Sequence, residues 1–353
     1  MTAMLAPAMQ PGAAVPATRP VVEVVDLVKV YPGRRGAPEV RAVDWITFAV
    51  HPGEFFGFLG PNGAGKTTTI RILATLTRAT SGVARVAGLD PAADAARVRA
   101  RIGIAMQAAA VEGLMTGREN LVLAGRLHRV PERELRARVE ELLELMNLGG
   151  AADRLAGTYS GGMRRRLDLA SALVHRPEVL FLDEPTEGLD PQSRAALWEE
   201  LARVNAAGTT MFLTTHYMEE ADRLCGRLAI VDEGRIVVEG APAELKRGVG
   251  ADQVTVTLAP DALAGAGDLD AVAADLAQVA GVGEVERTAA GLSIAAADAH
   301  AAIPAILRRL DGAGVTVEGL TMREPSLDDV FLRYCGRHIR VEEADQPMAL
   351  GWM

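Results

Sequence analysis

Short apolar runs recur over the first 240 residues, and polar or amphipathic stretches separate them. β-Branched or aromatic residues are frequent in each run, and several runs end at a Pro-Gly or Gly-rich turn. This composition is typical of strands that are buried in a sheet. We expect strands in seven segments: residues 21–31, 42–50, 54–59, 102–107, 179–185, 210–216 and 227–240.

Several stretches between these runs have the period of a helix. In residues 131–150, apolar side chains recur at spacings of three and four positions, with charged residues on the other faces. These side chains are Leu135, Val139, Leu142 and Met146. The spacing predicts helical structure over 115–148, ended by the glycine pair at 149–150. Shorter helices are expected at 67–77, 192–208 and 218–225.

Strands that alternate with helices predict a mostly parallel α/β sheet, and this first predicted domain covers residues 21–248. A helical subdomain is expected inside it, at about 108–176. After residue 248 the segments follow the order strand, helix, strand, strand, helix, strand, helix. That order is close to a split β-α-β domain. The predicted fold class is therefore α/β, with a small α+β domain at 249–340.

The two ends of the chain are predicted to lie outside these domains. Residues 1–20 lack the basic start of an export signal, and prolines at positions 7, 11 and 16 interrupt their apolar stretch. We therefore expect a disordered leader at 1–20 and a tail at 341–353. No apolar run approaches the ~20 residues that a membrane-spanning helix needs.

Composition and charge disfavour several classes of function. The 353 residues include 37 Lys and Arg against 46 Asp and Glu, which gives a net charge of −9 and disfavours a general nucleic-acid-binding surface. Any phosphate site must therefore be local. Cys225 and Cys335 are the only cysteines, which excludes a disulfide framework or a Cys-rich zinc site and favours a reducing cytoplasm.

A glycine-rich loop follows the third apolar run. Residues 60–67 match the phosphate-binding pattern G-x-x-x-x-G-K-[ST] at every fixed position. Glycines let successive backbone N–H groups turn toward a polyphosphate, and the positive end of the following helix faces the same anion. Because the chain has only three lysines, a chance match is improbable. The predicted nucleotide-binding residues of this loop are Gly60, Pro61, Asn62, Gly63, Ala64, Gly65, Lys66, Thr67 and Thr68.

Two acids end the apolar run at 179–182. Asp183, at the carboxyl end of a predicted buried strand, is placed to provide the acidic partner of Mg²⁺ on a nucleotide in the loop. Glu184 suits a general base that accepts a proton from the attacking water. Thr67 is predicted to offer its hydroxyl to the same Mg²⁺, and Lys66 its cation to the β- and γ-phosphates.

The next motif resembles the ABC ATPase superfamily. Ser160, Gly161 and Gly162, at the predicted start of a helix, are similar to the signature motif of that family. In the family, this motif binds the γ-phosphate of a nucleotide held by the partner subunit. The sequence departs from the common signature at Tyr159 and Met163, where Leu and Gln are usual. The absence of Gln removes one polar contact.

Four further residues stand where ABC ATPases have functional ones, although each alone would be an ordinary core or surface residue. Tyr31 resembles the aromatic residue that stacks on adenine. Gln107 resembles the glutamine that contacts Mg²⁺ or water and the membrane partner. His216 resembles the histidine that contacts the γ-phosphate and positions the water. Asp190 resembles the aspartate of the loop that crosses the dimer interface in that family. The resemblance covers roughly residues 21–245.

The end of the chain narrows the resemblance. Residues 324–332 read Glu-Pro-Ser-Leu-Asp-Asp-Val-Phe-Leu, which is similar to the C-terminal motif of drug-resistance ABC ATPases of the daunorubicin/doxorubicin type. In structural terms, Ser326 is predicted to cap a helix that carries Leu327, Val330 and Phe331 on one face. The charged run Arg164–Arg166 is expected to form a solvated helix face.

The resemblance implies a homodimer that binds ATP and Mg²⁺ and works with a separate integral membrane permease. It places the chain peripherally, at the cytoplasmic face of the cell membrane, where it would power efflux of a hydrophobic drug, antibiotic or lipid. Gln107 and the region 108–176 are the expected permease contact. The alternative is a soluble, non-transport ABC ATPase that acts on DNA or ribosomes, which the single cassette and the acidic balance disfavour. A GTPase is disfavoured because no Asn-Lys-x-Asp motif occurs.

Overall fold

The computed structural model describes residues 19–33, 38–259 and 266–336. Most of the predicted leader and the whole predicted tail lie outside these residues. The described chain forms two compact units. The first consists of Met1–Thr215 and Val231–Ile236, and the second consists of His216–Ile230 and Val237–Met353. The predicted domain boundary at residue 248 differs from this division and stays a prediction.

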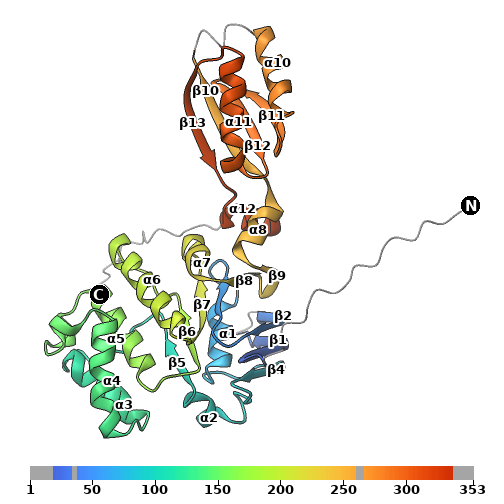
Figure 1. Cartoon of the computed structure of the whole chain (residues 1–353). Coiled ribbons are helices and arrows are strands. Elements are labelled where there is room, and N and C mark those ends of the chain that lie inside the picture. The colour runs from blue at the N-terminus through green and yellow to red at the C-terminus, as the bar shows by residue number, and fades with distance from the viewer. Residues whose placement is uncertain (1–18, 34–37, 260–265, 337–353) are drawn as a thin grey trace, which may run out of the picture. The chain divides into compact units, whose positions relative to one another are not determined.

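The first unit is built on two sheets (Figure 1). An antiparallel sheet has the strand order β2-β1-β4, and a parallel one contains the consecutive strands β5-β6-β7-β3. Every residue of β3, β6 and β7 is buried, which explains their continuous apolar runs. The bounds are β1 Val22–Tyr31, β2 Val40–Val50, β3 Phe55–Leu59, β4 Ser81–Val86, β5 Ile102–Ala105, β6 Val179–Asp183 and β7 Thr210–Thr215.

Two strand predictions need correction. The run 227–240 is not one strand, because Glu233 and Gly234 both have positive φ and turn the chain between β8 (Arg227–Asp232) and β9 (Arg235–Gly240). β4 was missed because its residues are mostly exposed, so that it has no apolar run.

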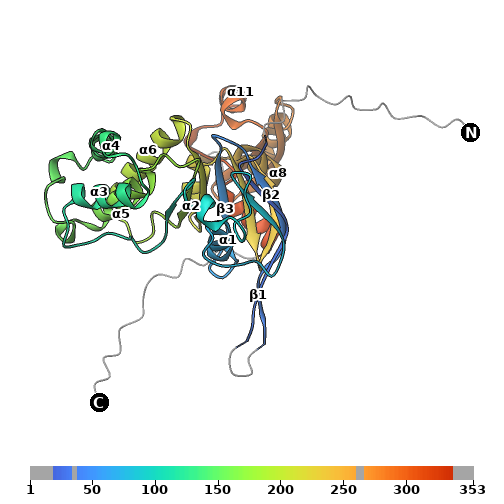
Figure 2. The ribbon, with the colours of Figure 1, turned by 90° about the horizontal axis from the view of Figure 1, so that it is seen from below.

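Three helices of the first unit gather away from β1 and β2, as Figures 1 and 2 both show: α3, α4 and α5. The predicted helix over 115–148 is interrupted at Arg129, which has positive φ, and at Pro131. The predicted end at 149–150 is also wrong, since α4 ends at Leu145 and Gly149–Ala151 form a 3₁₀ turn. The helices of this unit are α1 Lys66–Leu73, α2 Ala95–Arg99, α3 Gly117–Leu127, α4 Glu132–Leu145, α5 Gly161–Leu173 and α6 Pro191–Ala206.

The second unit contains a four-stranded antiparallel sheet with the order β11-β12-β10-β13. Each crossover helix joins strands that are not neighbours, which is the split β-α-β arrangement predicted for the C-terminal region. The elements are α7 Met218–Leu224, α8 Pro242–Val249, β10 Asp252–Leu258, α10 Ala266–Leu276, β11 Val282–Thr288, β12 Gly291–Ala296, α11 Ala299–Gly312, β13 Val317–Arg323 and α12 Leu327–Cys335.

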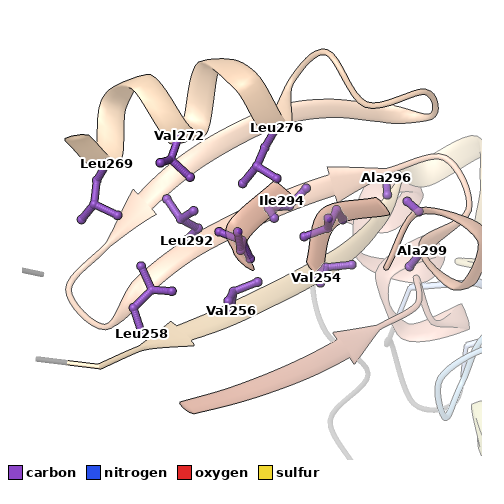
Figure 3. Close-up of a cluster of buried hydrophobic side chains, with 13 residues drawn as sticks. Val254, Val256, Leu258, Leu269, Val272, Leu276, Leu292, Ile294, Ala296 and Ala299 are labelled. Carbon is purple, nitrogen blue, oxygen red and sulfur yellow. The ribbon is translucent and has the colours of Figure 1, made fainter. Parts of the chain in front are cut away.

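The four-stranded sheet with α10 and α11, which we call the small domain, is held together by a separate hydrophobic core (Figure 3). Leu269, Val272 and Leu276 of α10 point toward the sheet, where Leu292 and Ile294 of β12 meet them. Residues of β10 and α11 complete the cluster, and all of its members are buried.

The last helix does not belong to that core. The buried residues of α12 are Leu327, Val330 and Phe331, none of them in the cluster described above, and α12 contacts α7 and α8 instead. Ser326 caps α12 through a reciprocal capping box with Asp329, as predicted. The final motif of the chain therefore packs on the helix that follows β7.

Truncation of the small-domain core should destabilise it strongly. We expect Leu292→Ala, at a fully buried position, to lower the free energy of unfolding by about 2–5 kcal/mol, because the lost methyl groups leave a cavity. The matched change Leu307→Ala, at a position that is 39% exposed, should cost no more than about 0.5 kcal/mol. Denaturant unfolding of both variants measures the difference, and equal losses would contradict the assigned core.

Candidate nucleotide-binding site

The glycine-rich loop leaves the buried strand β3 and enters α1. Gly63 and Gly65 have φ values of +82° and +99°, in the left-handed region that side chains disfavour. A Cβ at Gly60 or Gly65 would also lie 2.2 Å from a backbone carbonyl oxygen. Glycine is therefore required at these positions on steric and conformational grounds.

The amino end of α1 is open to an anion. The helix begins at Lys66, and its N-cap residue, Gly65, has no side chain that could accept hydrogen bonds from the first amides. Those N–H groups and the positive end of the helix dipole suit a phosphate group.

Lys66 begins α1 at the end of the loop, and 4% of its side chain is exposed. Its Nζ donates to the carbonyl oxygens of Gly60 (2.7 Å) and Pro61 (3.1 Å) and lies 3.2 Å from Oε1 of Glu184. Burial lowers the pKa of Lys66, and the charge of Glu184 opposes that shift. The ammonium group is thus held by two loop carbonyls and one carboxylate.

Asp183 joins the loop to the parallel sheet. Its buried Oδ1 accepts hydrogen bonds from the hydroxyls of Thr214 (2.6 Å) and Thr67 (3.1 Å). A carboxylate and a hydroxyl at this spacing are hard oxygen ligands, which fit Mg²⁺ that is shared with nucleotide phosphates. Three residues were predicted to hold the metal, and the structure brings two of them together, Thr67 and Asp183. The third, Gln107, donates to Glu187 instead.

Glu184 has a left-handed backbone, with φ +47°, which is uncommon for a residue with a side chain. Its N–H donates to the carbonyl oxygen of Thr214 at 3.0 Å, and its carboxylate is 11% exposed beside Lys66. The predicted base therefore lies next to the phosphate loop.

The structure also places the other predicted residues of the first unit. Gln107 is exposed, and its Nε2 donates to Glu187 at 2.5 Å. Asp190 is the N-cap of α6 and accepts from the backbone N–H of Ser193 at 2.9 Å. Tyr31 ends β1. Asn62 and Gly63 are exposed, Ala64 is buried, and Pro61, Gly65, Thr67 and Thr68 are half-buried.

His216 belongs to the second unit, where its ring lies 4.2 Å from that of Tyr217, just before α7.

The signature motif begins α5. Ser160 is the exposed N-cap, and its Oγ accepts from the N–H of Met163 at 3.2 Å. Gly161 is exposed, whereas Gly162 packs so closely on Ser193 that a Cβ would lie 3.0 Å from its hydroxyl. The unusual Tyr159 is buried and donates to the Ala151 carbonyl at 2.6 Å. This departure from the common signature thus has a structural role.

The expected solvated face at Arg164–Arg166 is wrong for Arg165. Only Arg164 is exposed, while Arg165 is 5% exposed and Arg166 is half-buried near Glu200. The sequence did contain a signal. Arg165 lies three residues after Gly162 and four before Leu169, on the buried stripe of α5.

Two family models match the chain. The ABC transporter model matches residues 43–187, and the model of the ATP-binding protein DrrA1-3-like C-terminal domain matches residues 240–335. The daunorubicin resistance ATP-binding protein DrrA2 of Streptomyces coeruleorubidus is 47% identical over 309 residues, which are 87% of this chain and 94% of that protein. The chain belongs to the ABC transporter ATP-binding protein family.

Other relatives and solved structures agree with this family. The Nod factor export ATP-binding protein I of Paraburkholderia xenovorans is 42% identical and is covered over 94% of its length, by 86% of this chain. A solved ATP-binding subunit of an ABC transporter has 28% identity and a TM-score of 0.58, over 65% of this chain and 92% of that one. The predicted ATPase of the ABC exporter type and its α/β fold are thereby confirmed.

A dimeric ATP-binding cassette bound to ADP and phosphate has a TM-score of 0.56 and 25% identity, over 62% of this chain and 98% of that one. Among residues 19–33, 38–259 and 266–336, no helix of this ABC subunit is long and apolar enough to cross a membrane.

Removal of the Lys66 ammonium should weaken nucleotide binding. We expect Lys66→Ala to raise the Kd for ATP on the order of 10- to 100-fold, the range of one charged hydrogen bond. Lys246→Ala, which removes a lysine from a surface ion pair with Asp222, is the matched control. Calorimetric titration with ATP measures both variants, and an unchanged Kd for Lys66→Ala would contradict the assigned site.

Proposed function

We propose that this ABC subunit powers the export of a hydrophobic drug, antibiotic or lipid through a separate membrane permease. The contact between Lys66 and Glu184 carries the proposal, because it joins the phosphate loop to the acid that would activate water. The direction of transport and the class of cargo are drawn from relatives named for daunorubicin resistance and Nod factor export.

The chain's own residues supply the chemistry of hydrolysis. The loop amides and Lys66 bind the phosphates, and Glu184 takes a proton from the attacking water. Thr67 and Asp183 would hold Mg²⁺, which neutralises phosphate charge. Gln107 would contact the same metal ion or the attacking water. His216 would contact the γ-phosphate, Thr68 the α-phosphate and Tyr31 the adenine.

The working unit would be a homodimer. The phosphate loop and Ser160 are both suited to bind the γ-phosphate of a nucleotide. Ser160, however, is the exposed N-cap of α5, so it could meet a nucleotide that a second subunit holds. A two-fold axis would let the signature residues Ser160, Gly161 and Gly162 of one subunit close the site of its twin, with Asp190 at the seam. ATP would then favour the closed state, and hydrolysis would release it.

The permease would be a different chain, because this chain matches relatives that are named as ATP-binding proteins over 94% of their length. We place the subunit at the cytoplasmic face of the cell membrane. Gln107, which is exposed at the end of β5, and the helices of region 108–176 would form the docking surface.

Removal of the base should trap the dimer. We expect Glu184→Gln to bind ATP but to hydrolyse it about 10²- to 10⁴-fold more slowly, because the neutral amide accepts no proton. Light scattering after addition of ATP should then detect stable dimers. Glu199→Gln, on the exposed face of α6, should turn over normally and remain monomeric after the ATP is consumed. Normal turnover by Glu184→Gln would remove Glu184 as the base, and a monomeric ATP complex would refute the shared site.

A further inference from the structure

We propose that Arg165 is a positioning residue for hydrolysis, which holds the backbone on both sides of Glu184 and so aims its carboxylate. The proposal rests on the role of Glu184 as base given above, and it assigns to α5 a task beyond presenting the signature motif to a partner.

Three backbone carbonyls converge on the Arg165 guanidinium. Nε donates to the oxygen of Pro185 at 2.8 Å, Nη2 donates to that of Asp183 at 3.3 Å, and Nη1 donates to that of Met106. These carbonyls belong to the residue before Glu184, the residue after it, and the residue before Gln107. The Arg165 side chain therefore connects α5 to the loop that contains Glu184 and to the loop that contains Gln107.

The left-handed backbone of Glu184 must be stabilised by contacts of this kind. A left-handed conformation is sterically unfavourable for a residue with a side chain, so it persists only where neighbouring contacts enforce it. The Asp183 carbonyl belongs to the peptide plane that precedes Glu184 and thus takes part in setting its φ. Arg165 holds that plane from one side, while the Glu184 N–H is held by Thr214 on β7.

The buried charge of Arg165 is balanced locally. Its Nη1 lies 3.2 Å from Oδ2 of Asp168, one turn further along α5, and both side chains are 6% exposed. Asp168 also accepts from the N–H of Ala110 at 3.0 Å, beyond Gln107. Burial raises the pKa of Asp168, and the charge of Arg165 opposes that shift. The ion pair is therefore fully engaged in hydrogen bonds, as a buried pair must be.

An arginine side chain can make these hydrogen bonds and the ion pair with Asp168 together, whereas another cation cannot. A guanidinium has five N–H donors in a rigid planar fork, which can reach carbonyls in three directions and a carboxylate together. A lysine ammonium at the same position keeps the charge opposite Asp168 but directs its three donors from one point. Arg165→Lys therefore removes the set of hydrogen bonds to the three backbone carbonyls, while it keeps the ion pair with Asp168.

The test compares Arg165→Lys with Arg308→Lys, at an exposed position of α11, in the full-length chain. We expect Arg165→Lys to lower kcat by about 10- to 100-fold, the effect of a displacement of roughly 1 Å at the reacting centre. The KM and the Kd for ATP should stay within about 2-fold of the parent values, because none of the Arg165 hydrogen bonds described above involves residues 60–68. Arg308→Lys should match the parent in kcat and in both constants for ATP. A rise in KM at unchanged kcat would overturn the proposal.

A double-mutant cycle identifies the residue through which Arg165 acts. In a Glu184→Gln background, single-turnover hydrolysis should not slow further when Arg165→Lys is added, since there is no base left to aim. An equal loss in both backgrounds would show that Arg165 acts elsewhere. If Glu184→Gln alone had normal turnover, the assigned base would fall instead, so the two failures are distinguishable.

A second variant covers the case in which Arg165→Lys does not fold. Replacement of the pair by Arg165→Met with Asp168→Leu removes both buried charges, which proteins often tolerate. Once its thermal unfolding shows a folded protein, it should bind ATP normally and hydrolyse it as slowly as expected for Arg165→Lys. Parental turnover in this double variant would refute the proposal.

Discussion

The nucleotide site depends on a buried cation held between main-chain carbonyls and one carboxylate, the contact of Lys66 with Glu184. The two residues come from loops that are far apart in the sequence, and the parallel sheet brings them together. In the register of that sheet, Leu59 pairs with Thr215, and Asp183 pairs with Thr214. Because the carboxyl ends of parallel strands meet at one edge, the loops after β3 and β6 must open side by side.

Positions at this edge are fixed by constraints that reinforce one another. The loop glycines allow a backbone that no other residue fits, while Thr67 and Thr214 hold the carboxylate of Asp183. Glu184 keeps a strained backbone under contacts from β7 and α5. Each contact is an ordinary hydrogen bond, but together they pre-organise charges before a nucleotide arrives, which is what electrostatic catalysis requires.

Local chemistry decided which parts of this arrangement the sequence could predict. The phosphate loop and the acids after β6 could be predicted because their function requires fixed residue types at fixed spacing. β4 could not, since its exposed residues carry no apolar pattern, and the split of 227–240 depended on a turn at Glu233 and Gly234. Arg165 was misjudged because a run of three arginines hid the buried stripe on which it lies. Charge alone does not tell whether a side chain finds carbonyl partners after folding.

The last helix shows a different limit of sequence reasoning. The amphipathic pattern of α12 predicted which face is buried, but not which partner covers that face. Its neighbours are α7 and α8, and Arg333 donates to the Val249 carbonyl at the end of α8. The ion pair of Lys246 with Asp222 connects α8 to α7 in turn. Since α7 follows β7 directly, a segment from the end of the chain stabilises the one that begins at His216. The last helix therefore packs within the second unit, on two helices that precede the small domain in the sequence.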